Sequence, residues 1–68
     1  MKVKYDKNAD ALYIEIQKGV FAKNKKMDSS TLVDLDKEGN ILGIEFLDVS
    51  KKIPLSSLSK LSTVSSTI

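Results

Sequence analysis

Two apolar, strand-forming stretches flank a short polar segment that contains a glycine, and this arrangement constrains the fold more than any other feature of the sequence. The first stretch is TLVDL (residues 31–35), the polar segment is DKEGN (36–40), and the second stretch is ILGIEFL (41–47). Runs of this kind, separated by a few residues that include Gly, predict a β-hairpin. We expect a type I turn at Lys37 and Glu38, followed by Gly39 in the left-handed conformation.

The register of this hairpin follows from the distribution of apolar side chains. Strict pairing would leave apolar residues on both faces. A β-bulge at Leu42-Gly43, which a glycine inside a strand often signals, shifts the register by one residue. One face then carries Val33, Leu35, Ile41, Ile44 and Phe46, and the other carries Asp34, Asp36 and Glu45. We prefer the bulged register because it separates apolar from polar residues.

Period-two alternation predicts two further strands near the N-terminus, at residues 2–6 and 11–17. Residues 20–28 carry too few apolar positions to assign, so they either extend the sheet or form a basic loop. The expected fold is mainly β, a four-stranded antiparallel meander with strands near 2–6, 11–17, 29–36 and 40–47, and with a short C-terminal helical segment against one face.

The composition changes after Asp48. Ser50 can cap a short helical turn and Pro54 can open another. Beyond it, Leu55, Leu58 and Leu61 are spaced to line one side of a helix. We expect a β-sheet domain at residues 1–53 and a Ser/Leu-rich segment at 54–68, with a short helix and a frayed end. The leucines either cover their own sheet or contact a partner.

The chain contains no Cys and no His, which excludes most enzymatic chemistry. Without thiolate or imidazole there is no Ser-His-Asp triad, no cysteine nucleophile and no zinc site. We therefore expect a non-enzymatic protein without a cofactor. The N-terminal residues lack the apolar core of a signal peptide, and no apolar run is long enough to span a bilayer, so we expect a cytoplasmic location.

Small size predicts self-association. A domain of 68 residues buries only about 60% of its unfolded surface, so its stability is marginal without further support. Disulfides and thiolate or imidazole metal sites are excluded, and the bulged register leaves Leu32, Leu42 and Leu47 outside the core. A two-fold homodimer is the expected solution.

The acidic residues of the hairpin resemble a calcium-binding loop. Residues 34–45 have carboxylates at the first, third, fifth and twelfth positions and Gly at the sixth. An EF-hand also needs helices on both sides and a useful ninth ligand, whereas here strands flank the loop and Leu42 is ninth. We expect no metal site, and a weak non-helical cation site at Asp34, Asp36 and Glu45 remains an alternative.

All 11 basic residues are lysines, and the net charge is +2. Lys18, Lys23, Lys25 and Lys26 lie in a stretch free of acids. Such a cluster is usually a solvated loop, and its alternative is a weak, salt-sensitive contact with nucleic acid. Arginine is absent, which disfavours sequence-specific reading of DNA.

The runs YDKNADALYIEI and VDLDKEGNILGIEFLDVSKKI resemble the domain of unknown function 2283 family of small bacterial and archaeal proteins. The positions that match the family pattern are Tyr5, Asp6, Ala9, Asp10, Leu12, Tyr13, Ile14, Asp34, Asp36, Gly39, Gly43, Ile44, Glu45 and Ser50. The chain departs from the pattern with Lys7 where Pro is common, Phe46 in place of a smaller aliphatic residue and Val49 where Ala is usual. The resemblance covers residues 1 to about 53 and leaves the C-terminal segment untouched.

The resemblance implies a compact β-rich domain and no activity or site. It also implies a neighbourhood of small toxin-like proteins and thus an antitoxin-like binder, against which the net positive charge argues slightly. The expected function is a non-enzymatic protein–protein interaction module, with Leu55, Leu58 and Leu61 as its contact. The alternatives are a lysine-mediated nucleic-acid binder and a cation-binding protein.

Overall fold

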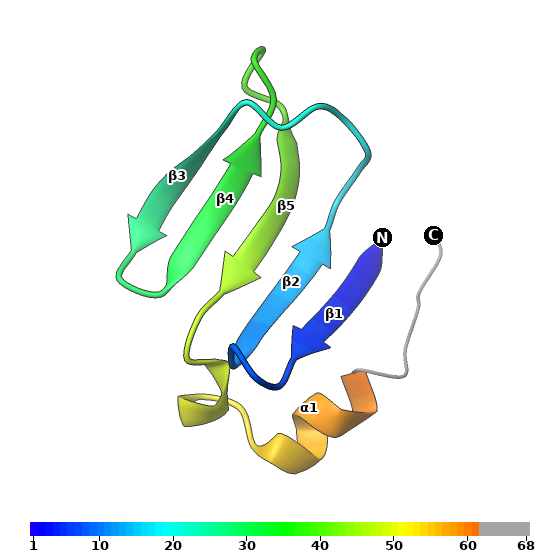
Figure 1. Cartoon of the computed structure of the whole chain (residues 1–68), viewed down its shortest axis with the longest axis vertical. Coiled ribbons are helices and arrows are strands. Elements are labelled where there is room, and N and C mark those ends of the chain that lie inside the picture. The colour runs from blue at the N-terminus through cyan, green and yellow to red at the C-terminus, as the bar shows by residue number, and fades with distance from the viewer. Residues whose placement is uncertain (62–68) are drawn as a thin grey trace.

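The computed structural model describes residues 1–61, which form one antiparallel sheet with two short helical segments at one end (Figure 1). The strands are β1 (Lys2–Asp6), β2 (Ala11–Glu15), β3 (Lys23–Asp28), β4 (Thr31–Leu35) and β5 (Ile41–Phe46). A 3₁₀ turn, η1 (Val49–Lys51), and a helix, α1 (Leu55–Leu61), follow. The predicted mainly β class and the C-terminal helix are confirmed. The frayed end expected after the helix, at residues 62–68, lies outside the described residues.

The four-stranded meander is wrong in both strand number and strand order. The sheet has five strands in the order β1-β2-β5-β4-β3. The strands β3, β4 and β5 follow one another, and residues 16–22 cross the sheet so that β2 lies beside β5 (Figure 1). A long connection that returns a strand beside the far end of three consecutive strands is the Greek-key arrangement.

The extra strand, β3, lies within residues 20–28, for which the sequence allowed either an extension of the sheet or a basic loop. All six of its residues are exposed, so no apolar alternation marks it. A tight turn joins it to β4: Asp28 pairs with Thr31, and an Asp28 Oδ1 oxygen accepts a hydrogen bond from the backbone N–H of Ser30 at 2.9 Å. Ser29 and Ser30, which we expected to begin a strand, therefore form the turn.

The predicted turn between β4 and β5 is confirmed. The backbone N–H of Gly39 donates to the carbonyl oxygen of Asp36 at 3.1 Å, and Gly39 has φ of 86°. The Asp36 side chain accepts hydrogen bonds from the backbone N–H groups of Glu38 (3.0 Å) and Asn40 (2.8 Å). A left-handed residue at this point is why glycine occupies position 39.

The predicted bulge is also confirmed. Asp34 pairs with Gly43 and Leu35 pairs with Ile41, which leaves Leu42 as the extra residue on β5. Leu42 is only 7% exposed because the crossover segment passes over it: a Cβ at Gly19 would overlap the Leu42 side chain. Leu42 is therefore covered by its own chain and is not part of an apolar surplus.

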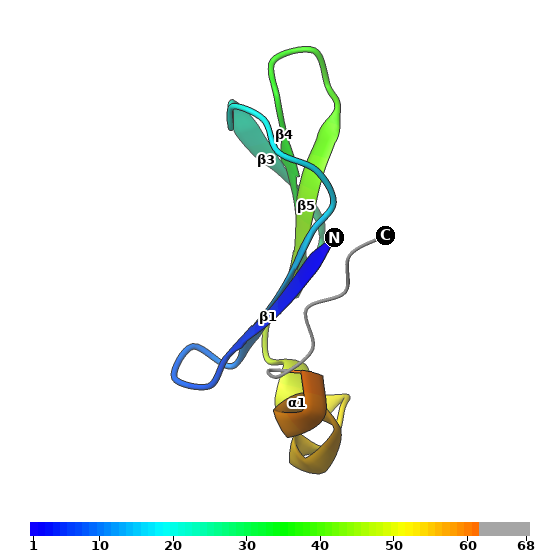
Figure 2. The same ribbon diagram turned by 90° about the vertical axis from the view of Figure 1, so that its right-hand side faces the viewer.

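The core lies at one end of the sheet. Leu12, Val49 and Leu58 are buried together, and Val3, Tyr5, Phe46 and Ile53 pack around them. Figure 2 shows α1 at the lower end of the sheet, not across it. Neither helical segment of residues 1–61 has the length and apolar character needed to cross a membrane.

We predict that Leu58→Ala lowers the free energy of unfolding by about 2–4 kcal/mol, because the side chain is fully buried and its removal leaves a cavity. Leu55, on the same helix and 60% exposed, is the matched control, and its replacement by Ala should cost less than about 0.5 kcal/mol. Urea denaturation of both variants checks this. Equal losses would mean that α1 does not pack as described.

Candidate interaction surface

One face of the sheet is mainly apolar, and we call it the apolar face. The strand register places these side chains on it: Val3, Tyr5, Leu12, Ile14, Thr31, Val33, Leu35, Ile41, Ile44 and Phe46. Within residues 1–61, α1 and η1 cover only the end that contains Tyr5, Leu12 and Phe46. Val33 and Ile44 in the middle of the face stay partly exposed, and Ile41 is 46% exposed. The middle and the far end of this apolar face are thus only partly covered by the described residues.

Lysines line both outer strands of the sheet. On β3, Lys25 is paired with Val33 and Lys23 with Leu35, so these two lysines share the apolar face. Lys26 is paired with Leu32 and belongs to the opposite face. On β1, Lys2 and Lys4 alternate with Val3 and Tyr5. The lysine cluster that the sequence suggested for nucleic acid is therefore divided between two faces.

The three leucines of the C-terminal segment do not act as one stripe. Leu58 is fully buried against its own sheet, so it covers the core and is not available to a partner. Leu55 is 60% exposed, and the surroundings of the Leu61 side chain lie outside the described residues. Beside η1, an apolar hollow of about 270 Å³ is lined by Thr31, Phe46, Leu47, Val49 and Ile53, among others.

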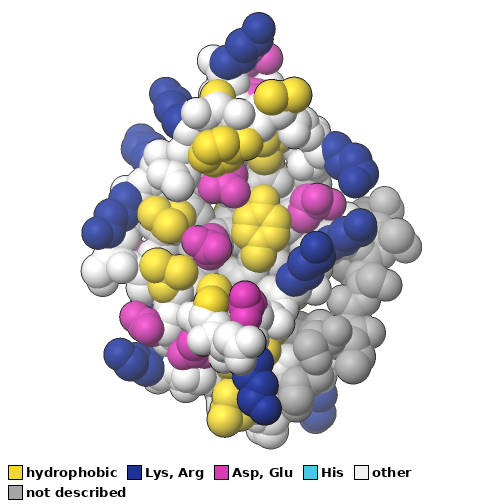
Figure 3. Space-filling model, viewed as in Figure 1, with side chains coloured by type: hydrophobic (Ala, Val, Ile, Leu, Met, Phe, Trp, Pro, Cys, Tyr) yellow, Lys and Arg dark blue, Asp and Glu magenta, His cyan; other side chains and the backbone are white. Residues whose placement is uncertain are grey.

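The opposite face of the sheet, which we call the polar face, is built around Tyr13. Figure 3 shows acidic side chains in the middle of this face and lysines around its outline. The Tyr13 hydroxyl donates a hydrogen bond to Asp34, and burial together with the negative charge of Asp34 raises the pKa of Tyr13. The Tyr13 ring lies across Gly43, where a Cβ would overlap it. This close approach is why position 43, which pairs with Glu15, is a glycine.

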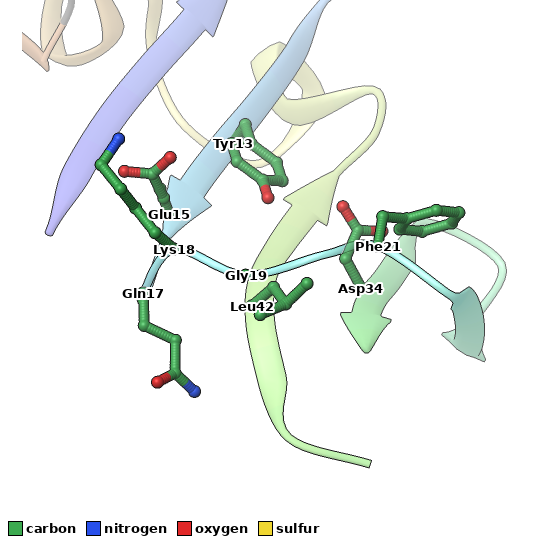
Figure 4. A pocket seen from close by; sticks show the side chains of 8 residues that line it. All are labelled: Tyr13, Glu15, Gln17, Lys18, Gly19, Phe21, Asp34 and Leu42. Carbon is green, nitrogen blue, oxygen red and sulfur yellow. The ribbon is translucent and has the colours of Figure 1, made fainter. Parts of the chain in front are cut away.

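A crevice of about 320 Å³ lies beside Tyr13 and is lined by Glu15, Lys18, Phe21 and Asp34, among others (Figure 4). Phe21 comes from the crossover segment and Asp34 from β4, so the crossover makes the crevice. Sequence reasoning did not find this grouping because the path of the crossover carries no sequence signal.

The three carboxylates proposed for a weak cation site are not brought together as an ion site. Asp34 and Glu45 share the polar face, as the bulged register predicted. Asp36 lies in the turn, where hydrogen bonds from Asn40, the strongest of its interactions, lower the pKa of Asp36. Within residues 1–61, no group of three or more acidic side chains is placed to hold a metal ion.

Residues 2–50 match the family described as protein of unknown function, DUF2283. The chain belongs to the DUF2283 family. No curated protein and no solved structure gave a significant match. This match confirms the resemblance noted in the sequence, and it covers the whole sheet and the beginning of η1.

Three of the residues that carried the DUF2283 resemblance meet at one carboxylate. The Tyr5 hydroxyl donates to Asp10 Oδ1 at 3.0 Å, the Ser50 backbone N–H donates to the same oxygen at 3.1 Å, and the Ser50 hydroxyl donates to Oδ2 at 2.7 Å. The hydrogen bond from the Ser50 side chain is the main cause that lowers the pKa of Asp10. Asp10 also has a positive φ of 52°. This network fixes η1 to the β1–β2 turn.

We predict that Asp10→Asn destabilises the DUF2283 domain at neutral pH. Because the folded-state pKa of Asp10 lies below the unfolded value of 3.8, its stabilisation is complete above that pH and is lost as the pH falls through the folded value. The difference in unfolding free energy between wild type and variant should therefore be constant near neutrality and shrink below about pH 4. Urea denaturation across pH measures it, with Glu38→Gln as the control. A difference that persists unchanged to pH 2 would contradict the assignment.

Proposed function

We propose that this DUF2283 protein is a non-enzymatic protein–protein interaction module, acting in the cytoplasm, and that the apolar face is its contact surface. The observation that supports the proposal is the incomplete cover of this face: α1 and η1 lie over one end, while Val33 and Ile44 remain partly exposed. A sheet that is apolar on one face gains stability by burying that face against another layer. The non-enzymatic character and the cytoplasmic location rest on the sequence alone.

The structure changes which residues carry the proposal. The sequence placed the contact on the leucines of the C-terminal segment, but Leu58 is used by the core of its own domain. The apolar side chains of β4 and β5 take its place, because they form continuous cross-strand rows: Val33 pairs with Ile44, which pairs with Ile14. These three side chains are partly exposed. A contiguous apolar patch marks an interaction site more reliably than scattered single residues do.

A lysine-mediated contact with nucleic acid is the second candidate, and the exposure of β3 along its whole length favours it. Three lysines lie on this strand, of which two point to the apolar face and one to the polar face. A phosphate backbone that followed the β3 edge would meet all three. Such binding would weaken steeply with salt. We rank it below protein binding because apolar side chains adjoin the two lysines on the apolar face.

Adjacent residues of β4 provide a matched test. Val33 lies on the apolar face and Leu32 on the polar face, and both are partly exposed aliphatic side chains. We predict that Val33→Glu abolishes capture of the partner by the tagged protein in its native cells, because a carboxylate would be buried in the contact. Leu32→Glu should leave capture unchanged.

Mass spectrometry of the captured proteins, with circular dichroism to confirm that both variants fold, makes the comparison. Equal capture by Val33→Glu and wild type would overturn the proposal that the apolar face is the contact surface.

A further inference from the structure

We infer that the partner of the apolar face is a second copy of this chain, packed face to face in a two-fold dimer. The inference rests on the proposed function and names its partner. It starts from the two outer strands of the sheet, which are the other surfaces open to self-assembly. Both carry lysines, with Lys23, Lys25 and Lys26 on β3 and Lys2 and Lys4 on β1. Charged edges of this kind oppose strand-to-strand pairing between copies.

The size of the apolar face favours a second sheet over a single helix. Five strands about 4.8 Å apart, each with five or six residues rising about 3.4 Å, give a face about 24 Å wide and at least about 17 Å long. An α-helix with its side chains is about 10–12 Å across and covers at most half of that width. A second copy has the same dimensions and packs at the usual separation of about 10 Å between sheets.

Charge selects the direction of the two-fold axis. An axis perpendicular to the strands would place β3 over the partner's β3, and Lys23 and Lys25 of both copies would then meet. An axis parallel to the strands places β3 over the partner's β1, whose Lys2 and Lys4 belong to the polar face. Lys23 and Lys25 of the two copies then lie at opposite edges of the interface. Because β5 is the middle strand, Ile44 then lies close to the axis and faces Ile44 of the second copy.

The same axis brings a projecting side chain to a hollow. Helix α1 contacts β1, so the second copy's helix lies below β3 and β4 at the same end of the sheet. Leu55 on α1 is 60% exposed, and the apolar hollow of about 270 Å³ is lined there by Thr31, Phe46 and Ile53. A patch that carries both the projection and the hollow is self-complementary, as a two-fold interface requires.

The face measures about 400 Å² and the standard interface buries about 800 Å² per partner, so the dimer is expected to be weak, with dissociation in the micromolar range. Sedimentation velocity between about 1 and 200 µM should show the species shift from the 7.5 kDa monomer to twice that mass. Leu55→Asp should weaken dimerisation about tenfold or more. Val20→Asp is the matched control, since Val20 is 84% exposed on the crossover segment, and it should have no effect.

A single cysteine tests the geometry, because the chain has none of its own. Because sheets about 10 Å apart hold two facing cysteines beyond disulfide reach, a short bis-maleimide reagent is used. It should cross-link two copies of Ile44→Cys, whereas Glu45→Cys, on the next residue and the opposite face, should not be cross-linked. If the Leu55→Asp variant fails to fold, the Leu55→Ser variant replaces it in the sedimentation experiment. Wild type that dimerises and variants that behave as described support the inference.

Two results separate this inference from the proposed function. In the first, the wild type stays monomeric at about 200 µM, but Val33→Glu still abolishes capture of another protein. This result overturns the second copy as occupant and leaves the apolar face as the contact surface. If the wild type is monomeric and the Val33→Glu and Leu32→Glu variants capture the same proteins, two proposals are overturned: the second copy as occupant and the apolar face as contact surface.

Discussion

A β-sheet has two faces, and residues 1–61 of this DUF2283 domain cover only part of the apolar one. On the polar face the sheet can meet water directly, because Glu15, Asp34 and Glu45 surround Tyr13. On the apolar face the described residues supply one short helix of 7 residues, and it lies at the end of the strands. Removing the rest of this face from water requires a layer that residues 1–61 do not contribute. The interaction proposed here follows from this imbalance between the two faces.

The position of α1 depends on the Asp10 carboxylate. Asp10 holds Ser50 through its backbone and its hydroxyl, and the backbone N–H of Val49 donates to the Asp10 carbonyl oxygen at 3.2 Å. These contacts hold the start of η1 at the β1–β2 turn. The chain that follows β5 therefore runs below β1 and β2 and does not cross the middle of the sheet. Leu58 then reaches Leu12 and Val49, while Val33 and Ile44 stay out of its reach. This polar network thereby determines which part of the apolar face residues 1–61 leave partly exposed.

The sequence predicted those features whose causes are local. The turn at Lys37 and Glu38 with its left-handed Gly39, and the bulge beside Gly43, are each signalled by a glycine at a defined position. β3 carried no such signal, since an exposed edge strand rich in lysine has no apolar alternation. Strand order was also out of reach, because it depends on the crossover segment lying over Leu42. The role of the C-terminal leucines stayed open for a related reason: leucine spacing alone does not tell whether Leu58 covers its own sheet or a partner.

The proposed association requires an apolar face that is open in the isolated chain and closed in the dimer, and methyl NMR with a soluble paramagnetic agent measures this directly. In dilute protein the account predicts strong broadening of the Ile14 and Ile44 methyl signals, because described residues leave both partly exposed. As the protein concentration rises, these signals should regain intensity while that of Val20, on the crossover segment, stays broadened. Ile14 and Ile44 signals that are protected equally at every concentration would contradict the account, since the chain itself would then cover the face.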